Sequence, residues 1–238
     1  MKNNCSKVIA GFASVVVSLV TYHSAVAATP GSSIIYDNTA AASYLNNFFS
    51  SNLEYGDEIN FAGNKRALTD IQFEYNANII TIDQTEKVSF KLYKNDGLNG
   101  VPSTVLYDSN TDQAGGIPVF NGINHIDIGG LNLQVPDNVT FAVQFTGLGP
   151  GESAGLTMYD PPTVGKLLAG GVIGSYDDFW ENAGGTWTLF RFPNGNPAGN
   201  FGARFSAIPE ASTVSYALLG GLILVGSQAY RRFSAKRS

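Results

Sequence analysis

Carboxylates next to aromatic rings are the combination in this sequence best suited to chemistry. Asp177, Asp178 and Glu181 enclose Phe179 and Trp180 in the run DDFWE. A glycosidase needs two carboxyl groups at a set separation, one of them held protonated, and this run offers candidates for both. Sugar binding without catalysis needs similar residues, because sugar rings stack on exposed aromatics while carboxylates accept hydrogen bonds from hydroxyls. The third interpretation, which we favour over the glycosidase, is a solvated loop anchored to the core by its rings.

Nucleophilic and zinc chemistry lack the residues they need. Beyond residue 27 the chain has one histidine, His125, and no cysteine. No Gly-x-Ser-x-Gly elbow is present to partner that histidine, and a zinc site would need further His or Cys ligands. We therefore expect no enzymatic activity and no cofactor.

The candidate ligand-binding residues are Trp180, Tyr176, Asp177 and Asp178, with an envelope polysaccharide as the partner. We expect Trp180 at a loop tip before a glycine pair, where exposure and burial are both open. Trp187 lies in the run TWTLFRF, which alternates, so one face must be buried. The sequence therefore predicts Trp187 in the core.

Calcium is the metal that an acidic β protein of this kind could take. Asp108, Asn110 and Asp112 alternate and carry hard oxygen ligands, but no distal Glu completes an EF-hand loop. These residues equally fit an ordinary turn, which we favour over the calcium site.

The elements that position these residues are predicted to be β-strands. Residues 67–76, 87–94 and 139–147 each alternate apolar and polar side chains, with Phe73, Phe90 and Phe141 on the apolar faces. Many short strands with frequent turn residues and no strand–helix alternation indicate an all-β protein. We expect a two-sheet antiparallel β-sandwich or jelly roll.

Three segments carry more specific predictions. Residues 40–49 are the best helix candidate, and Gly129-Gly130 is read as a tight hairpin between two strands. The glycine-rich stretch 147–185 is read as long loops at one end of the sandwich. Shorter strands are predicted at 34–36, 59–61, 105–107, 123–128, 131–135, 156–159, 187–192 and 201–206.

The N-terminus has the pattern of a secretory signal peptide. Lys2 and Lys7 precede an apolar stretch at 8–20, and Ala25 and Ala27 form an A-x-A cleavage site. The only cysteine, Cys5, lies in the segment to be removed. We expect a signal peptide at 1–27 and a mature chain beginning at Ala28.

The C-terminus is predicted to hold the precursor in the inner membrane. Residues 211–230 are uncharged and would form about 30 Å of helix, one hydrocarbon thickness. Arg231 and Arg232 open a basic stub that the positive-inside rule keeps in the cytoplasm. The domains are then a β-sandwich at 28–207 and a sorting signal at 208–238.

This C-terminal arrangement resembles the PEP-CTERM sorting signal of Gram-negative bacteria. Pro209 and Glu210 match the start of the Pro-Glu-Pro motif, Ala211 replaces its second proline, and Arg231-Arg232 match the Arg-rich end. The resemblance covers residues 207–238 and implies recognition by an exosortase, a membrane-embedded cysteine protease. A plain tail anchor is the alternative. The rest of the chain resembles secreted β-sandwich domains found fused to this signal, which carry no catalytic residues; that likeness rests on 54–59, 71–75, 90–93 and 102–107.

Charge separates the middle of the chain from its ends. All 19 acidic residues lie between 28 and 210, while six of the 14 basic residues lie outside that range, which leaves a net charge of −11 there. Such a surface repels nucleic acid and anionic lipid. We expect an exported protein of the cell surface or extracellular matrix.

Overall fold

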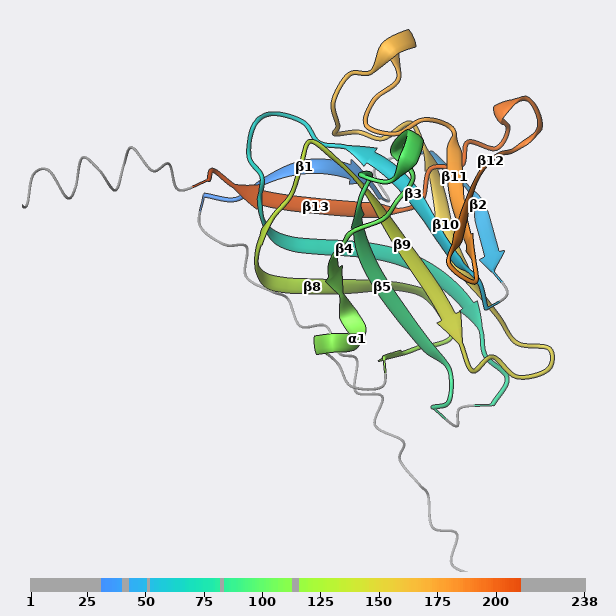
Figure 1. Ribbon diagram of the computed structural model, residues 1–238. Coiled ribbons are helices and arrows are strands. Elements are labelled where there is room, and N and C mark those ends of the chain that lie inside the picture. The colour runs from blue at the N-terminus through green and yellow to red at the C-terminus, as the bar shows by residue number, and fades with distance from the viewer. Residues whose placement is uncertain (1–30, 40–42, 51, 82–83, 113–115, 211–238) are drawn as a thin grey trace, which may run out of the picture.

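The protein is all-β, with two antiparallel sheets packed face to face as a sandwich (Figure 1). The computed structural model describes residues 31–39, 43–50, 52–81, 84–112 and 116–210. The signal peptide, the C-terminal span and the positions Ala25, Ala27, Arg231 and Arg232 lie outside these residues. Within the described part of the chain, no helix is long and apolar enough to cross a membrane.

The first sheet has six strands. Five of them pair successively across the sheet, in the spatial order β1-β13-β4-β10-β2, and the sixth, β8, pairs with β4 outside this path. The strands are β1 (Ser33–Asn38), β13 (Ala203–Ile208), β4 (Ala67–Asn78), β10 (Ser153–Asp160), β2 (Ser43–Ser50) and β8 (Gly122–Gln134).

The second sheet has seven strands, six of them in one path, with β7 pairing separately with β5. They are β12 (Thr186–Arg191), β11 (Asp178–Ala183), β3 (Glu54–Asn60), β9 (Asn138–Thr146), β5 (Lys87–Lys94), β6 (Val105–Asp108) and β7 (Ile117–Pro118). A short helix, α1 (Ser109–Asp112), follows β6, and single 3₁₀ turns occur at Leu98–Gly100, Ala169–Gly171 and Pro193–Gly195.

The alternating rows of the sequence form the core, as predicted. Phe141 from the seven-stranded sheet and Phe205 from the six-stranded sheet meet with ring centroids 5.9 Å apart. Phe90 stacks on both Phe141 and Phe73, so aromatic rings bridge the two layers. The predicted inward rows are all buried: Ile71, Phe73, Tyr75; Val88, Phe90, Leu92; and Val139, Phe141, Val143, Phe145.

The helix predicted at 40–49 is wrong for the described part of that segment, because Ser43–Ser50 forms the edge strand β2. Phe48 points inward and packs against Tyr55, Phe179 and Phe201. Aromatic residues favour strands, and this interlayer packing outweighs the modest local helix preference of the segment.

Two glycine-based predictions are also wrong. Gly129 and Gly130 lie inside the single strand β8, at a register shift against β4, instead of in a hairpin. Glycine adopts bulge conformations as readily as turn conformations, and Gly130 has a φ of +74°. The stretch 147–185 contains loops and β10, which confirms the strand predicted at 156–159, but it also contains β11, which was not predicted. Gly155 belongs to β10, where a Cβ would collide with the backbone of Phe48 on β2.

Candidate functional site

Strand register places polar and aromatic side chains in adjacent rows on the outer face of the seven-stranded sheet. Across four strands, Trp187 pairs with Asn182, Asn182 with Glu54, and Glu54 with Gln144. Paired residues of antiparallel strands share a face, so these four side chains lie on the side opposite the core.

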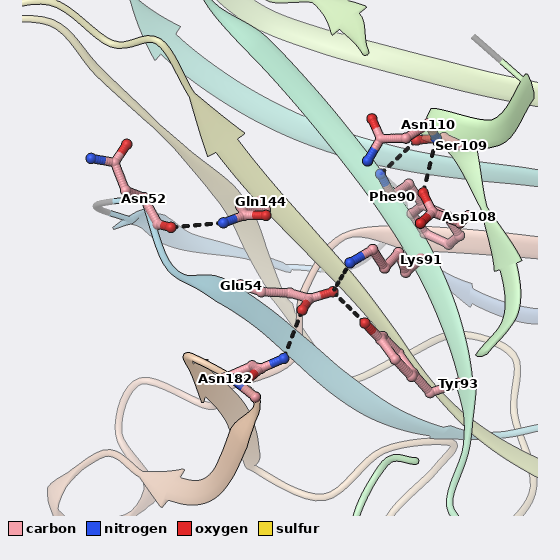
Figure 2. A network of polar contacts seen from close by, with 11 residues as sticks. Asn52, Glu54, Phe90, Lys91, Tyr93, Asp108, Ser109, Asn110, Gln144 and Asn182 are labelled. Carbon is pink, nitrogen blue, oxygen red and sulfur yellow. Dashed lines mark hydrogen bonds and ion pairs between the residues drawn. The ribbon is translucent and has the colours of Figure 1, made fainter. Parts of the chain in front are cut away.

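Glu54 is the centre of a polar network on this face (Figure 2). Glu54 is only 6% exposed, and both oxygens of its carboxylate have partners. Tyr93 Oη donates to Oε1 at 2.8 Å, Asn182 Nδ2 donates to Oε2 at 2.9 Å, and Lys91 Nζ lies 3.7 Å from Oε1. Burial raises the pKa of Tyr93, and the Glu54 charge raises it further. The network therefore ties β3, β5 and β11 together and holds Tyr93 as a hydrogen-bond donor.

Three aromatic rings gather beside this network. Trp187 packs edge-to-face on Tyr93 at 5.3 Å and on Trp180 at 6.5 Å. Tyr93 and Trp187 come from strands that are separated by three others, so their side chains reach across the sheet. The row between them contains the small residues Gly56 and Ala142, which leave room for the rings. At Gly56 a Cβ would lie 2.5 Å from the Phe141 carbonyl oxygen.

We call this surface the aromatic–polar face, defined by Glu54, Lys91, Tyr93, Trp180, Asn182 and Trp187. Its accessible groups are a ring, an amide and an ammonium group, from the partly exposed Trp187, Asn182 and Lys91, whereas Glu54, Tyr93 and Trp180 are buried. That is the chemistry with which proteins bind sugars: rings contact apolar C–H groups, while polar side chains exchange hydrogen bonds with hydroxyls.

The predicted settings of the two tryptophans are both corrected. Trp180 lies within β11 and is 7% exposed, not at a loop tip, and its indole N–H has no partner among the described residues. Trp187 is partly exposed instead of buried in the core. The cause is position in the sheet: β11 has neighbours on both sides, whereas β12 is an edge strand.

The glycine pair after Trp180 explains this arrangement. Gly184 and Gly185 have φ of +61° and +91° and form the two-residue turn of the β11–β12 hairpin. Positive φ at both central positions is the requirement of a type I′ turn, and Gly-Gly supplies it. Two glycines between two aromatic runs are a hairpin signal, which could have predicted both strands in place of the loop tip expected at Trp180.

The other predicted ligand residues lie at the far end of β11. Tyr176 is 40% exposed in the preceding loop, and Asp177 pairs with Arg191 at 3.3 Å. Asp178 is the first residue of the strand. Its pKa is raised, mainly by burial; the charge of Arg191 acts against this increase and the charge of Asp177 adds to it. Asp178 and Trp180 share the outer face of β11, whereas Tyr176 and Asp177 precede the strand.

A fully buried carboxyl group, which sequence reasoning missed, lies between the sheets. Asp57 is 0% exposed, with its Oδ1 2.5 Å from Ser175 Oγ and its Oδ2 accepting the Phe201 N–H at 3.1 Å. Burial raises the pKa of Asp57 well above its usual range. These contacts fasten the segments around 175 and 201 to β3. The alternation Tyr55–Asp57–Ile59 was the available signal.

His125, the histidine considered for catalysis, is exposed on β8. Its Nδ1 lies 3.1 Å from Oε1 of Glu74, which is itself 1% exposed and accepts a hydrogen bond from Tyr159 Oη at 2.6 Å. The contacts among His125, Glu74 and Tyr159 connect β8, β4 and β10 on the outer face of the six-stranded sheet.

The calcium candidates form a turn. Asp108 Oδ1 accepts a hydrogen bond from the Asn110 N–H at 2.9 Å (Figure 2). Thr111 Oγ1 donates to the Asp108 carbonyl at 2.7 Å. Asp108 thereby starts helix α1, whose Ser109 hydroxyl accepts the Phe90 N–H at 2.9 Å. The Asp112 side chain lies outside the described atoms. Among the side chains described, no three His, Cys, Asp or Glu residues gather into a metal-binding group.

The residues of the sorting motif follow the last strand directly. β13 ends at Ile208, and both Pro209 and Glu210 are exposed. The peptide at this junction is therefore outside the packed core of the sandwich.

Comparisons with known proteins add little to this geometry. No family model and no curated protein matches the sequence. Among solved structures, the chain is similar to the cysteine protease and lectin-like domains of Cwp84, a surface layer associated protein of Clostridium difficile, with a TM-score of 0.41 and 12% identity. The match covers 67% of this chain and 33% of that one, so the chain spans about a third of its length. A TM-score this low carries no argument about fold or function.

Proposed function

We propose that the chain is an exported cell-envelope or extracellular-matrix protein with a non-catalytic β-sandwich and a C-terminus processed by an exosortase. The observation that carries this proposal is the exposed Pro209-Glu210 junction immediately after β13. A membrane-embedded protease needs an accessible peptide between the folded domain and the membrane span, and this junction meets that need.

The routing proceeds from the two terminal segments. Cleavage after Ala27 frees the N-terminus, the span 211–230 retains the precursor in the inner membrane, and Arg231-Arg232 fix its orientation. Cleavage near Pro209-Glu210 then frees or transfers the domain. The net charge of −11 over 28–210 is suited to a soluble extracellular domain and unsuited to a nucleic-acid partner.

Intact-mass spectrometry of the exported protein tests this routing. We expect a chain that begins at Ala28 and ends close to Pro209, and we expect precursor to accumulate when Arg231 and Arg232 are both changed to Glu. Lys166→Glu, an exposed change within the domain, is the charge control and should leave processing unaltered. A mature mass that still contains residues 218–225 would instead identify a tail anchor.

The second candidate function is carbohydrate binding through the aromatic–polar face. It is supported by Trp187, whose partly exposed ring is held by Tyr93 next to the Glu54 network. A ring fixed in this way stacks on a sugar without losing much side-chain entropy, and the neighbouring amide and ammonium groups hydrogen-bond to hydroxyls.

Trp187→Ala should weaken binding to the producer's envelope polysaccharide by about tenfold or more, because an aromatic anchor is removed. Leu189→Ala is the matched control, since Leu189 is 48% exposed on the same face of β12. Binding is measured by affinity electrophoresis, with thermal melts to verify folding. Equal binding by the wild type and Trp187→Ala would remove this candidate function and leave the routing proposal intact.

A further inference from the structure

The outer face of the six-stranded sheet contains a polar groove of about 420 Å³. This volume falls in the range of ligand sites, roughly 300–1,000 Å³. Strand pairing explains the hollow: Ser206 on β13 lies opposite Asp70 on β4, and Asp70 lies opposite Gly129 on β8. Serine and glycine leave space above the sheet on both sides of the Asp70 carboxylate.

Charged side chains from three strands line this groove: Asp70, Arg204 and Asp127. Arg204 pairs with Gln72, and Gln72 pairs with Asp127, so these residues form the row next to Asp70. Gln72 Nε2 donates to Asp127 Oδ1 at 2.7 Å. Within the described residues, the Asp70 carboxylate and the Arg204 guanidinium have no hydrogen bond or ion pair, although both residues are half-buried. The groove therefore contains a carboxylate acceptor and a guanidinium donor that have no hydrogen-bond partner among the described residues.

We propose that this groove binds a neutral saccharide. Each sugar hydroxyl both donates and accepts, so neighbouring hydroxyls can be satisfied by a carboxylate on one side and a guanidinium on the other. Ile34, 43% exposed among the lining residues, offers apolar surface to the C–H groups of the ring.

The charges of the groove and of the surrounding domain disfavour an anionic ligand. Asp70 and Asp127 outnumber Arg204 in the groove, and the surrounding domain has a net charge of −11, so a polyanion is repelled. The groove belongs to the six-stranded sheet and the aromatic–polar face to the seven-stranded sheet, so the two sites are separate and their tests are independent.

Nuclear magnetic resonance titration of the ¹⁵N-labelled mature protein with neutral trisaccharides tests the groove. The probes are maltotriose, cellotriose, mannotriose and chitotriose, each added up to about 10 mM. We expect at least one to shift the backbone amides of Ser206 and Gly129. Arg204→Met, which keeps the aliphatic stem, and Asp70→Asn should each weaken that binding about tenfold or more. Lys166→Met is the control for loss of an exposed cation and should bind as the wild type does.

The chemical-shift changes of the wild type test the groove even if a variant fails to fold. The proposal is overturned if no neutral trisaccharide shifts the groove amides, or if both folded variants bind normally. It is also overturned if trigalacturonate binds there more tightly than every neutral probe. Shifts confined to the Trp187 indole would reject the groove while supporting the aromatic–polar face.

Discussion

Phe141→Ala is expected to destabilise the domain by about 3–5 kcal/mol, the usual cost of removing a fully buried phenylalanine ring. The Phe141 side chain is 0% exposed and contacts Phe90 within its own sheet and Phe205 in the opposite sheet. Truncation leaves a cavity between two layers that are held apart by other large rings, so the surroundings cannot close the space.

The free energy of unfolding in urea measures this loss, and Phe120→Ala is the control. The Phe120 ring is 48% exposed, so its truncation should cost less than about 1 kcal/mol. A similar small loss for Phe141→Ala would mean that β9 turns its other face to the core.

Asp57→Ala should also be strongly destabilising, whereas Asp57→Asn should be tolerated and should alter the pH dependence of stability. The Ser175 hydroxyl lies near both Asp57 Oδ1, at 2.5 Å, and the Tyr176 carbonyl, at 3.0 Å, but it has a single proton. In the protonated state, which burial favours, the Asp57 carboxyl can donate to Ser175 while Ser175 donates to Tyr176. An asparagine reproduces the same pattern through its NH₂ group, and its carbonyl still accepts the Phe201 N–H.

The sign of the pH effect follows from the raised pKa of Asp57, which burial causes. The folded state holds the proton more tightly than the unfolded chain does. The stabilisation is therefore complete below the unfolded pKa, about 3.9, and is lost as the pH rises through the folded pKa. Burial raises the pKa of Glu58 and Asp178 in the same direction. We expect the wild type to become less stable as the pH rises above about 4.

Urea unfolding at a series of pH values separates the two Asp57 variants. Asp57→Asn should unfold with a flatter pH profile and gain stability relative to the wild type at high pH. Asp57→Ala should lose about 1–3 kcal/mol at low pH, because the Phe201 N–H is left without an acceptor, and a cavity adds to that loss. Parallel profiles for the wild type and Asp57→Asn would show that Asp57 is not the group that titrates.

The fold class and the inward faces of β4, β5 and β9 could be predicted from the sequence. Alternation in 67–76, 87–94 and 139–147 depends on the two-residue period of an extended chain, which is a local property. The end of the domain at Pro209-Glu210 was predicted from the motif and the uncharged stretch that follows it, and β13 ends just before it, at Ile208.

Which side chains are exposed and which lie together could not be predicted, because both depend on the tertiary structure. Trp180 and Trp187 lie in similar aromatic runs, and their exposure depends on which strand has two neighbours in the sheet. The groove at Asp70 and Arg204 depends on the register of β13, β4 and β8, which are far apart in sequence. Alternation assigns a residue to a face of its own strand, but strand order and register decide what lies beside it and what covers it.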